Sequence, residues 1–475
     1  MCSVGAILFA GLLWLDGAFD ARVFAPLVCV ALQIQMLWTL VSWKWIGREL
    51  FSPYGLFVIA VFVFNAGQSS LEILGLNHGG LLEGQFPERR IAETLLFVLY
   101  GLSLVHLGAL VAGTQGAQRQ RAASLQPKSV TLRRVAAAFF LVALIPSIMM
   151  WQRALALVSQ GGYMAIYQAD LATGFGAAPT VLSGFLVPSG FLLLAGSGRR
   201  RWLRLAACAI VGSYVLAHLL VGSRGYGIAV LAAFVWLWHR IVRRIPLVPV
   251  MAIGASIAVF ILPVIGVTRM NSRQQMTLSQ LAESWAGIDG PAVYTLHEMG
   301  SSMITSAYTI QMVPARHEYE LGGSYAYALF SLVPNLFWSV HPAAEHSPSK
   351  WLVNNAEPER ARVSGGLGYS VIAEAYLNFG WWGAGVPLAL IGWAVGRLSM
   401  WADLSQATSG LCLAAILLSS LLIYARAETG EVIRGFAWYA AIPYLIVTYW
   451  PSADYRRRPE PDRASATISK GAAPA

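Results

Sequence analysis

Charged residues are scarce in this sequence. Asp, Glu, Lys and Arg make up 12% of the 475 residues, whereas hydrophobic residue types make up 57%. A globular protein carries about 25% charged and about 45–50% apolar residues. The shortage of charge excludes a series of soluble domains and an intrinsically disordered chain, because both need far more polar surface. It indicates a chain that lies mostly within lipid.

Metal-binding and disulfide patterns are also missing. The four cysteines are far apart in the sequence and show no CxxC or CxxH spacing, and the histidines of the long loop described below match no HExxH or HxxEH motif. These absences give no support to a disulfide framework or a zinc site. We therefore expect no metal ion and no other cofactor. The residues concerned are Cys2, Cys29, Cys208, Cys412, His297, His317, His341 and His346.

Long apolar runs, in contrast, are abundant. The sequence has roughly twelve runs of about 15–25 apolar residues, the pattern expected of helices that cross a hydrocarbon core of about 30 Å. The sequence therefore predicts an all-α polytopic integral membrane protein. The runs are Val4–Leu15, Val23–Trp43, Pro53–Leu74, Ile91–Ala112, Val135–Trp151, Pro179–Leu194, Trp202–Leu220, Tyr226–Trp238, Leu247–Val267, Tyr369–Val395, Leu411–Tyr424 and Phe436–Trp450.

The basic residues lie in clusters between these runs. The 33 Lys and Arg exceed the 23 Asp and Glu, giving a net charge of +10. The clusters fall on alternate connections, so one face carries nearly all of them, and the positive-inside rule predicts that this face and both termini are cytoplasmic. This distribution is not that of a nucleic-acid-binding protein. The clusters are Lys44 with Arg48, 119–134, 199–204, 240–244, Arg397 and 456–458.

One connection is much longer than the others. Residues 268–368 contain eight acidic and six basic residues and no predicted span, and they fall on the outer side. Long connections of this kind are usually functional. The predicted organisation is a bundle of about nine helices over residues 1–267, this loop, about three further helices over 369–450, and a disordered cytoplasmic tail over 451–475.

Arginines on the outer face are exceptions to the positive-inside rule and are therefore candidates for binding an anion. Arg224 lies between glycines in Gly222-Ser223-Arg224-Gly225, Arg269 and Arg273 are four residues apart, and Arg426 and Arg434 flank the last outer loop. A guanidinium can hold a phosphate with two parallel hydrogen bonds. The alternatives are an arginine at a helix boundary, two solvated charges, and ion pairing with Glu428 and Glu431.

A polar stripe enters the tenth predicted span. In a helix, Ser370, Glu374 and Asn378 share one face, and a carboxylate close to the membrane needs a function or a partner. Glu374 is thus a candidate general base, or else a structural hydrogen-bond partner. Aromatic residues of the long loop, Tyr325 and Trp338 among them, suit stacking on sugar rings or a membrane-interface belt.

The order of several short motifs resembles the Wzy-type oligosaccharide repeat-unit polymerases, the O-antigen polymerase family. The resemblance covers the chain from about Pro53 to Pro443. The motifs that carry it are Gly222-Ser223-Arg224-Gly225, Gly161-Gly162-Tyr163, Gly322-Gly323-Ser324-Tyr325, Val333-Pro334-Asn335, Glu374-Ala375-Tyr376-Leu377-Asn378-Phe379-Gly380 and the loop from Arg426 to Arg434.

The resemblance implies a glycosyltransferase of the bacterial inner membrane that acts on its periplasmic side. Such an enzyme moves a growing glycan from undecaprenyl diphosphate onto the next lipid-linked repeat unit. The arginines would stabilise the leaving diphosphate without a metal, and Glu374 or a loop histidine would accept the proton of the acceptor hydroxyl. Tyr325, Trp338 and Asn378 would bind the glycan. A flippase and a polysaccharide chain-length regulator are expected partners.

Three alternatives stay open at this stage. An O-antigen ligase would use a similar outer-face arrangement but transfer the finished glycan. A polysaccharide flippase or other transporter also has about twelve spans, although its polar residues are expected near the midplane of the membrane. A metal-dependent glycosyltransferase would have to use Asp16 and Asp20, which lie in a very short outer loop.

Overall fold

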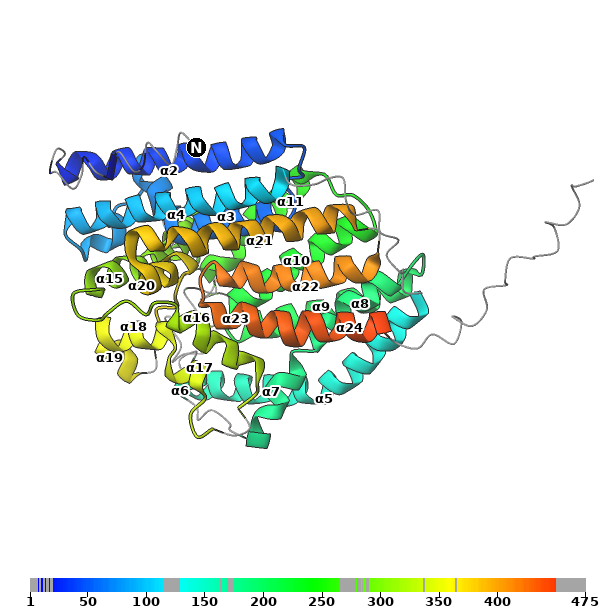
Figure 1. The fold of residues 1–475 in the computed structure, drawn as a ribbon. Helices are drawn as coiled ribbons and strands as arrows, with labels where there is room; N and C mark the ends of the chain where they lie inside the picture. Colours follow the sequence, from blue (N-terminus) through cyan, green and yellow to red (C-terminus); the bar gives the residue numbers. More distant parts are fainter. Residues whose placement is uncertain are drawn as a thin grey trace, which may run out of the picture.

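The computed structural model describes residues 20–114, 129–162, 165–168, 174–264, 290–335, 338–363, 365–405 and 407–449, together with isolated residues before and between these ranges. Within these ranges the regular structure is helical throughout, without a strand. Figure 1 shows the long helices lying side by side as one bundle. The predicted all-α polytopic fold is confirmed.

The bundle is built from helices of membrane-spanning length. Eight helices in the described part are at least 18 residues long and apolar enough to cross a membrane, and two shorter apolar helices accompany them. The helix Arg224–Ile241 also packs in the bundle but is not among these ten. The predicted first span, Val4–Leu15, lies almost entirely outside the described residues. The bundle helices are α2 (Ala21–Trp45), α3 (Pro53–Ile73), α4 (Glu88–Thr114), α5 (Ser129–Gly161), α7 (Ala178–Ser183) with α8 (Leu186–Gly196), α9 (Arg201–Leu220), α10 (Arg224–Ile241), α11 (Leu247–Ser256) with η3 (Ile257–Ile261), α21 (Gly385–Leu404), α22 (Thr408–Tyr424), and α23 (Thr429–Arg434) with η6 (Gly435–Ala441) and α24 (Ile442–Tyr449).

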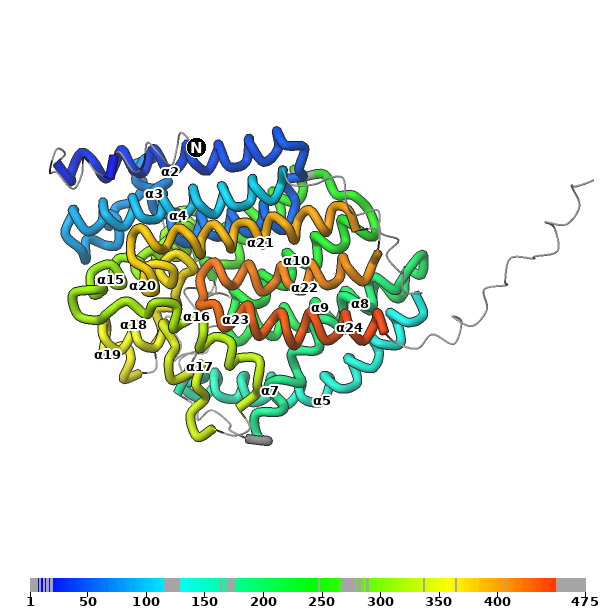
Figure 2. Tube along the Cα trace, in the orientation of Figure 1, coloured from blue at the N-terminus to red at the C-terminus, as the bar shows by residue number. Residues whose placement is uncertain are grey.

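Short helices gather at one end of the bundle, on the left in Figures 1 and 2, and we call this the loop end. Most of them belong to the predicted long loop. They are α14 (Pro291–Gly300), η4 (Ser301–Met303), α15 (Ile304–Met312), α16 (Gly323–Ala328), η5 (Leu329–Leu332), α17 (Pro342–Glu345), α18 (Pro348–Ala356), α19 (Pro358–Arg362) and α20 (Val371–Gly383), with η1 (Leu81–Gly84), α6 (Ala165–Gln168) and η2 (Gly174–Ala177) from other connections.

Helix α4 is the most buried of the candidate spans. It packs against α21 through glycines that leave room for only a hydrogen atom. A Cβ at Gly108 would lie 1.9 Å from the carbonyl oxygen of Ala389, and a Cβ at Gly392 would lie 1.9 Å from that of Val105. Small residues of this kind let two membrane helices approach closely.

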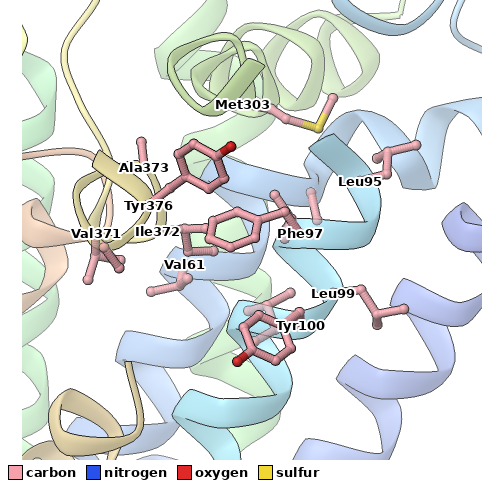
Figure 3. Packing of buried hydrophobic residues seen from close by; sticks show 14 of the residues in the cluster. Val61, Leu95, Phe97, Leu99, Tyr100, Met303, Val371, Ile372, Ala373 and Tyr376 are labelled. Carbon is pink, nitrogen blue, oxygen red and sulfur yellow. The ribbon is translucent and has the colours of Figure 1, made fainter. Parts of the chain in front are cut away.

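The predicted single span Tyr369–Val395 is wrong, because the chain forms two helices there. Gly380 has φ +65° and ψ −159°, a conformation that side chains disfavour, and the candidate span α21 begins only at Gly385. Helix α20 therefore stays at the loop end. Figure 3 shows Ile372 and Tyr376 of α20 beside Phe97 of α4; the Phe97 and Tyr376 ring centroids are 5.1 Å apart and nearly perpendicular.

The opposite end of the bundle, which we call the basic end, carries the described members of the predicted basic clusters. The chain order of α2, α5, α8, α9, α10 and α21 brings these clusters to the same end. Glu49 and Asp403 are the acidic residues that the described part places there. Arg240 contacts both: its Nη1 is 2.9 Å from Asp403 Oδ1 and 3.7 Å from Glu49 Oε2.

Candidate active site at the loop end

The predicted polar stripe lies in and just before helix α20 and is buried. Ser370 caps the helix, with its Oγ accepting a hydrogen bond from the backbone N–H of Ala373 at 3.1 Å. Glu374 and Asn378 follow on the same face, and all three stripe residues are at most 1% exposed. Because the Ser370 side chain caps the first turn of α20, the start of this helix is fixed. The stripe residues therefore have a fixed orientation at the loop end.

The Glu374 carboxylate joins two segments that are distant in sequence. Its Oε1 accepts a hydrogen bond from Ser324 Oγ at 3.0 Å, and its Oε2 accepts two from Thr429, one from the backbone N–H and one from Oγ1, both at 2.8 Å. Tyr424 shares a further hydrogen bond with Thr429 Oγ1 at 2.8 Å. The carboxylate thus holds the start of α16 against the start of α23, and we call Ser324, Glu374, Asn378 and Thr429 the carboxylate junction.

Asn378 completes the junction. Its Nδ2 donates to Ser324 Oγ at 2.7 Å and to the carbonyl oxygen of Glu374 at 2.8 Å, and its Oδ1 accepts from the N–H of Gly322 at 2.9 Å. Gly322 has φ +94°, a left-handed conformation suited to glycine. Both polar atoms of the amide are therefore used to hold the turn that presents Ser324.

Burial raises the pKa of the Glu374 carboxyl from 4.5 to about 7. The hydrogen bonds from Thr429 and Ser324 favour the ionised form and oppose this rise, whereas the charge of Glu428 adds to it. A carboxyl with a pKa near the working pH can accept a proton efficiently and release it again. The junction thus has the electrostatic property that a general base needs.

Glu428 makes a second carboxylate contact beside the junction. Its Oε2 accepts hydrogen bonds from Ser347 Oγ at 2.9 Å and from the backbone N–H of Ser349 at 3.1 Å. Burial raises the pKa of Glu428, and the bonds from these serines oppose the rise. Glu428 therefore fixes α18 to the last loop.

Arg224 begins α10 at the loop end and is largely buried. Its guanidinium pairs with Glu298 of α14, and its Nη1 donates to the carbonyl oxygen of Leu262 at 2.8 Å. The Arg224 side chain is 11% exposed and that of Glu298 30%. Glu298 therefore holds the Arg224 guanidinium in one orientation. The two contacts use two of the five N–H donors of this guanidinium and leave the other three for further contacts.

The other predicted arginines differ in their surroundings. Arg426 follows α22, and its guanidinium carbon lies 5.9 Å from the centre of the Phe64 ring. Its carbonyl oxygen accepts from the N–H of Tyr369, so it lies directly beside the start of α20. Arg434 pairs with Glu431 one turn earlier in α23. Arg269 and Arg273 lie outside the described residues.

The two predicted glycan-binding aromatic residues are in different parts of the loop end. Tyr325 directly follows Ser324 and lies over Phe379, with ring centroids 6.3 Å apart. The Tyr325 hydroxyl is buried without a hydrogen-bond partner among the described residues, and burial raises its pKa. Trp338 lies farther along the segment, with its ring 6.2 Å from Phe330 and 5.2 Å from His341.

The histidines of the long loop are not part of the junction's hydrogen bonds. His317 contacts Glu320 at 3.1 Å, and His341 contacts the carbonyl oxygen of Val333 at 2.9 Å. His346 stacks on Tyr327 with ring centroids 3.6 Å apart. No group of three or more His, Cys, Asp or Glu that could hold a metal ion occurs in the part of the chain that the structure describes.

Sequence reasoning missed Ser324, Ser347 and Thr429 as members of this site. Each is a common polar residue in a loop or at a helix start, and its carboxylate partner is 50 to 81 residues away in the sequence. No local pattern indicates such a pairing. The sequence drew attention to Ser324 only through the Gly322-Gly323 turn before it, which is part of one of the motifs that carry the family resemblance.

Comparison with protein-family models gives one assignment. The model for the O-antigen polysaccharide polymerase Wzy matches residues 4–451 of the chain. Comparisons with curated proteins and with solved structures give no match. Because the match extends from before the first described helix to the end of the bundle, the chain belongs to the O-antigen polysaccharide polymerase Wzy family, whose members act on lipid-linked oligosaccharides in a membrane and polymerise the repeat units into O-antigen.

Proposed function

We propose that the polymerisation takes place at the carboxylate junction, on the periplasmic face of the bacterial inner membrane. The donor is a growing glycan on undecaprenyl diphosphate, and the acceptor is the next lipid-linked repeat unit. The observation that supports this most directly is Glu374, a buried carboxyl with a pKa of about 7 at the end of the bundle that carries the long loop.

The orientation is supported by the charges at the two ends. The described part of the basic end carries a dozen Lys and Arg against Glu49 and Asp403, whereas acidic residues are frequent at the loop end. Basic residues are retained on the cytoplasmic side. The loop end, with residues 268–368, is then periplasmic, and both termini are cytoplasmic.

In the proposed reaction, an oxygen of the acceptor sugar attacks the anomeric carbon of the donor. The new C–O bond forms as the bond between that carbon and the phosphate oxygen breaks, and undecaprenyl diphosphate leaves with the electron pair. The proton of the acceptor hydroxyl passes to Glu374. Because Glu374 is only 1% exposed, the half-buried Thr429 hydroxyl is placed to relay this proton to Oε2.

The leaving diphosphate needs positive charge, and arginines are proposed to supply it. Arg224 is held by Glu298 and retains donors for a phosphate, and Arg426 lies beside the start of α20. Arg434, Arg269 and Arg273 are proposed to contribute to the same anion. A guanidinium fork matches two phosphate oxygens. We therefore propose a metal-independent reaction, which predicts that a purified preparation keeps its activity in EDTA.

The glycan is proposed to lie against Tyr325 and Trp338. The partnerless Tyr325 hydroxyl is suited to a hydrogen bond with a sugar, since a buried polar group without a partner is costly. Asn378 is proposed to act on the glycan indirectly, by holding the turn that carries Ser324 and Tyr325. A flippase that delivers the lipid-linked unit and a chain-length regulator are the proposed partners.

A deletion strain tests the proposed step. On a gel of its lipopolysaccharide, loss of a polymerase leaves a single repeat unit on the lipid A core, loss of a ligase leaves none, and loss of a flippase traps the lipid-linked unit in the cytoplasmic leaflet. We expect the single unit, and full chains on complementation. Thr429→Ser should also restore chains, whereas Thr429→Val, which lacks the hydroxyl, should not.

A further inference from the structure

A stretch of the long loop carries no charge. Between Glu320 and Glu345 the 24 residues 321–344 include no Asp, Glu, Lys or Arg, although they belong to the loop that would otherwise lie in water. The described residues of this stretch form only short helices, α16, η5 and α17, and no candidate span. An uncharged segment too broken to cross a membrane is typical of the membrane interface.

Large apolar side chains of this stretch point away from the protein. They come from η5 and the residues after it, and we call them the apolar patch. Their exposed fractions are 55% for Leu329, 41% for Phe330, 41% for Leu332, 38% for Val333 and 54% for Val340. Four of the five are aliphatic, so the patch suits acyl chains better than sugar rings, which prefer aromatic faces.

The apolar patch is continuous with the surface of a candidate membrane span. Ser331 Oγ lies 3.1 Å from the carbonyl oxygen of Gly430, and Trp438 Nε1 donates to the carbonyl oxygen of Leu332 at 3.0 Å. Gly430 and Trp438 belong to the candidate span Thr429–Tyr449, whose Phe436 is itself 46% exposed. The patch therefore extends a surface that faces lipid.

The backbone at the patch is also adapted to an environment with little water. The two carbonyl groups at the end of η5 are both bonded to side chains, that of Leu332 to Trp438 and that of Val333 to His341. Unsatisfied backbone groups are expensive in lipid, so such pairing is a requirement there. The neighbouring α18 and α19, in contrast, carry Lys350, Glu359 and other charged residues.

We propose that η5 and Val333, together with Val340, insert into the lipid at the loop end of the bundle, so that the apolar patch lies among the acyl chains of that leaflet. The segment begins four residues after Tyr325, so it joins the lipid surface to the carboxylate junction. This inference depends on packing and charge alone and stands whether or not Glu374 is the proton acceptor.

Spin labels in vesicles of phosphatidylethanolamine and phosphatidylglycerol test this insertion. Cysteines replace Leu332 and Val340 one at a time, in protein with Cys2→Ser and Cys208→Ser; Cys29 and Cys412 are buried and stay. Leu141, 69% exposed in α5, gives the lipid reference, and Glu359, whose side chain is 80% exposed, gives the water reference. Each cysteine variant is first shown to support O-antigen chains in the deletion strain.

Collision rates with oxygen, which is concentrated in lipid, and with a water-soluble nickel complex give the result. We expect oxygen collisions to dominate at Leu332→Cys and Val340→Cys, as at Leu141→Cys. Dominance of nickel collisions at either position, as at Glu359→Cys, would overturn the proposal. That result would mean that the patch faces water in vesicles and is covered by another protein in the cell.

Discussion

At the scale of the residue, protonation of Glu374 is expected to stabilise the folded protein and to lower its activity. The pKa is about 7 in the folded protein and 4.5 for an exposed carboxyl, so folding favours the protonated form. The stability that this proton contributes is fully present below about pH 4.5 and is lost as the pH rises through about 7. The proposed base, however, works only when it is ionised.

We therefore predict that between about pH 6 and pH 8 the polymerisation rate rises while the unfolding temperature falls. The rate is measured with purified protein and lipid-linked repeat units, and the unfolding temperature is followed in detergent. In Glu374→Gln the fall in unfolding temperature should be smaller, because this group no longer titrates. An equal fall in the variant and the wild type would assign the effect to other groups such as Glu428.

Arg224 gives a second prediction at this scale. If its fork holds the leaving diphosphate, Arg224→Lys should lose nearly as much activity as Arg224→Ala, because an ammonium keeps the charge but loses the planar geometry. The Lys variant keeps a countercharge for Glu298, so its amount in the membrane should exceed that of the Ala variant. Chain lengths on a gel and membrane protein levels are measured together. Glycan chains of normal length from the Arg224→Lys variant would show that Arg224 has only a structural role.

The polar stripe could be predicted from the sequence because residues four apart in a helix share a face. What the stripe contacts could not be predicted. Ser324 and Thr429 meet Glu374 from segments 50 and 55 residues away, and no periodicity connects them. Likewise, Arg224 was recognised as unusual from its place at the outer boundary, but its pairing with Glu298 depends on how α10 packs against α14.

At the scale of the element, the break between α20 and α21 decides where Glu374 lies. Hydropathy predicted one continuous span because the apolar sequence continues through Trp381 and Trp382. Gly380 ends the helix by its backbone conformation, which hydropathy does not report. The other seven candidate spans of the described part were predicted correctly, since length and apolarity are what the membrane requires of them. The predicted span Tyr226–Trp238 forms α10, which is not among the candidate spans.

We predict that Gly380→Ala destabilises the protein by about 1–3 kcal/mol, because a side chain there is strained. The new Cβ would also lie 2.8 Å from the Tyr319 hydroxyl oxygen. Gly212→Ala in α9 is the matched control, since its Cβ would meet no atom within 4 Å and alanine favours a helix. Unfolding temperatures in detergent measure both. Equal temperatures for the two variants would show that the break tolerates a side chain.

At the scale of the whole molecule, the bundle has two chemically different ends, and the orientation follows from them. We predict that a reporter fused after Trp351 is active only in the periplasm and that one fused after Pro459 is active only in the cytoplasm, because the basic end stays inside. The fusions use an enzyme that requires export and one that requires the cytoplasm. The reverse pattern would move the carboxylate junction to the cytoplasmic side and remove its proposed substrate.

The central claim is that Glu374 accepts the proton of the acceptor hydroxyl, and the chain-length ladder of Glu374→Gln tests it most directly. An amide of the same size can still accept from the Thr429 N–H and donate to Ser324, so the protein should reach the membrane at a normal level. Glu359→Gln, on the exposed face of α19, serves as the control and should give full ladders. For Glu374→Gln we predict polymerisation lower by about 10²–10⁴-fold, with single repeat units dominating the gel. A full ladder at a normal protein level, or a protein level that falls as far as the chains do, would contradict the claim.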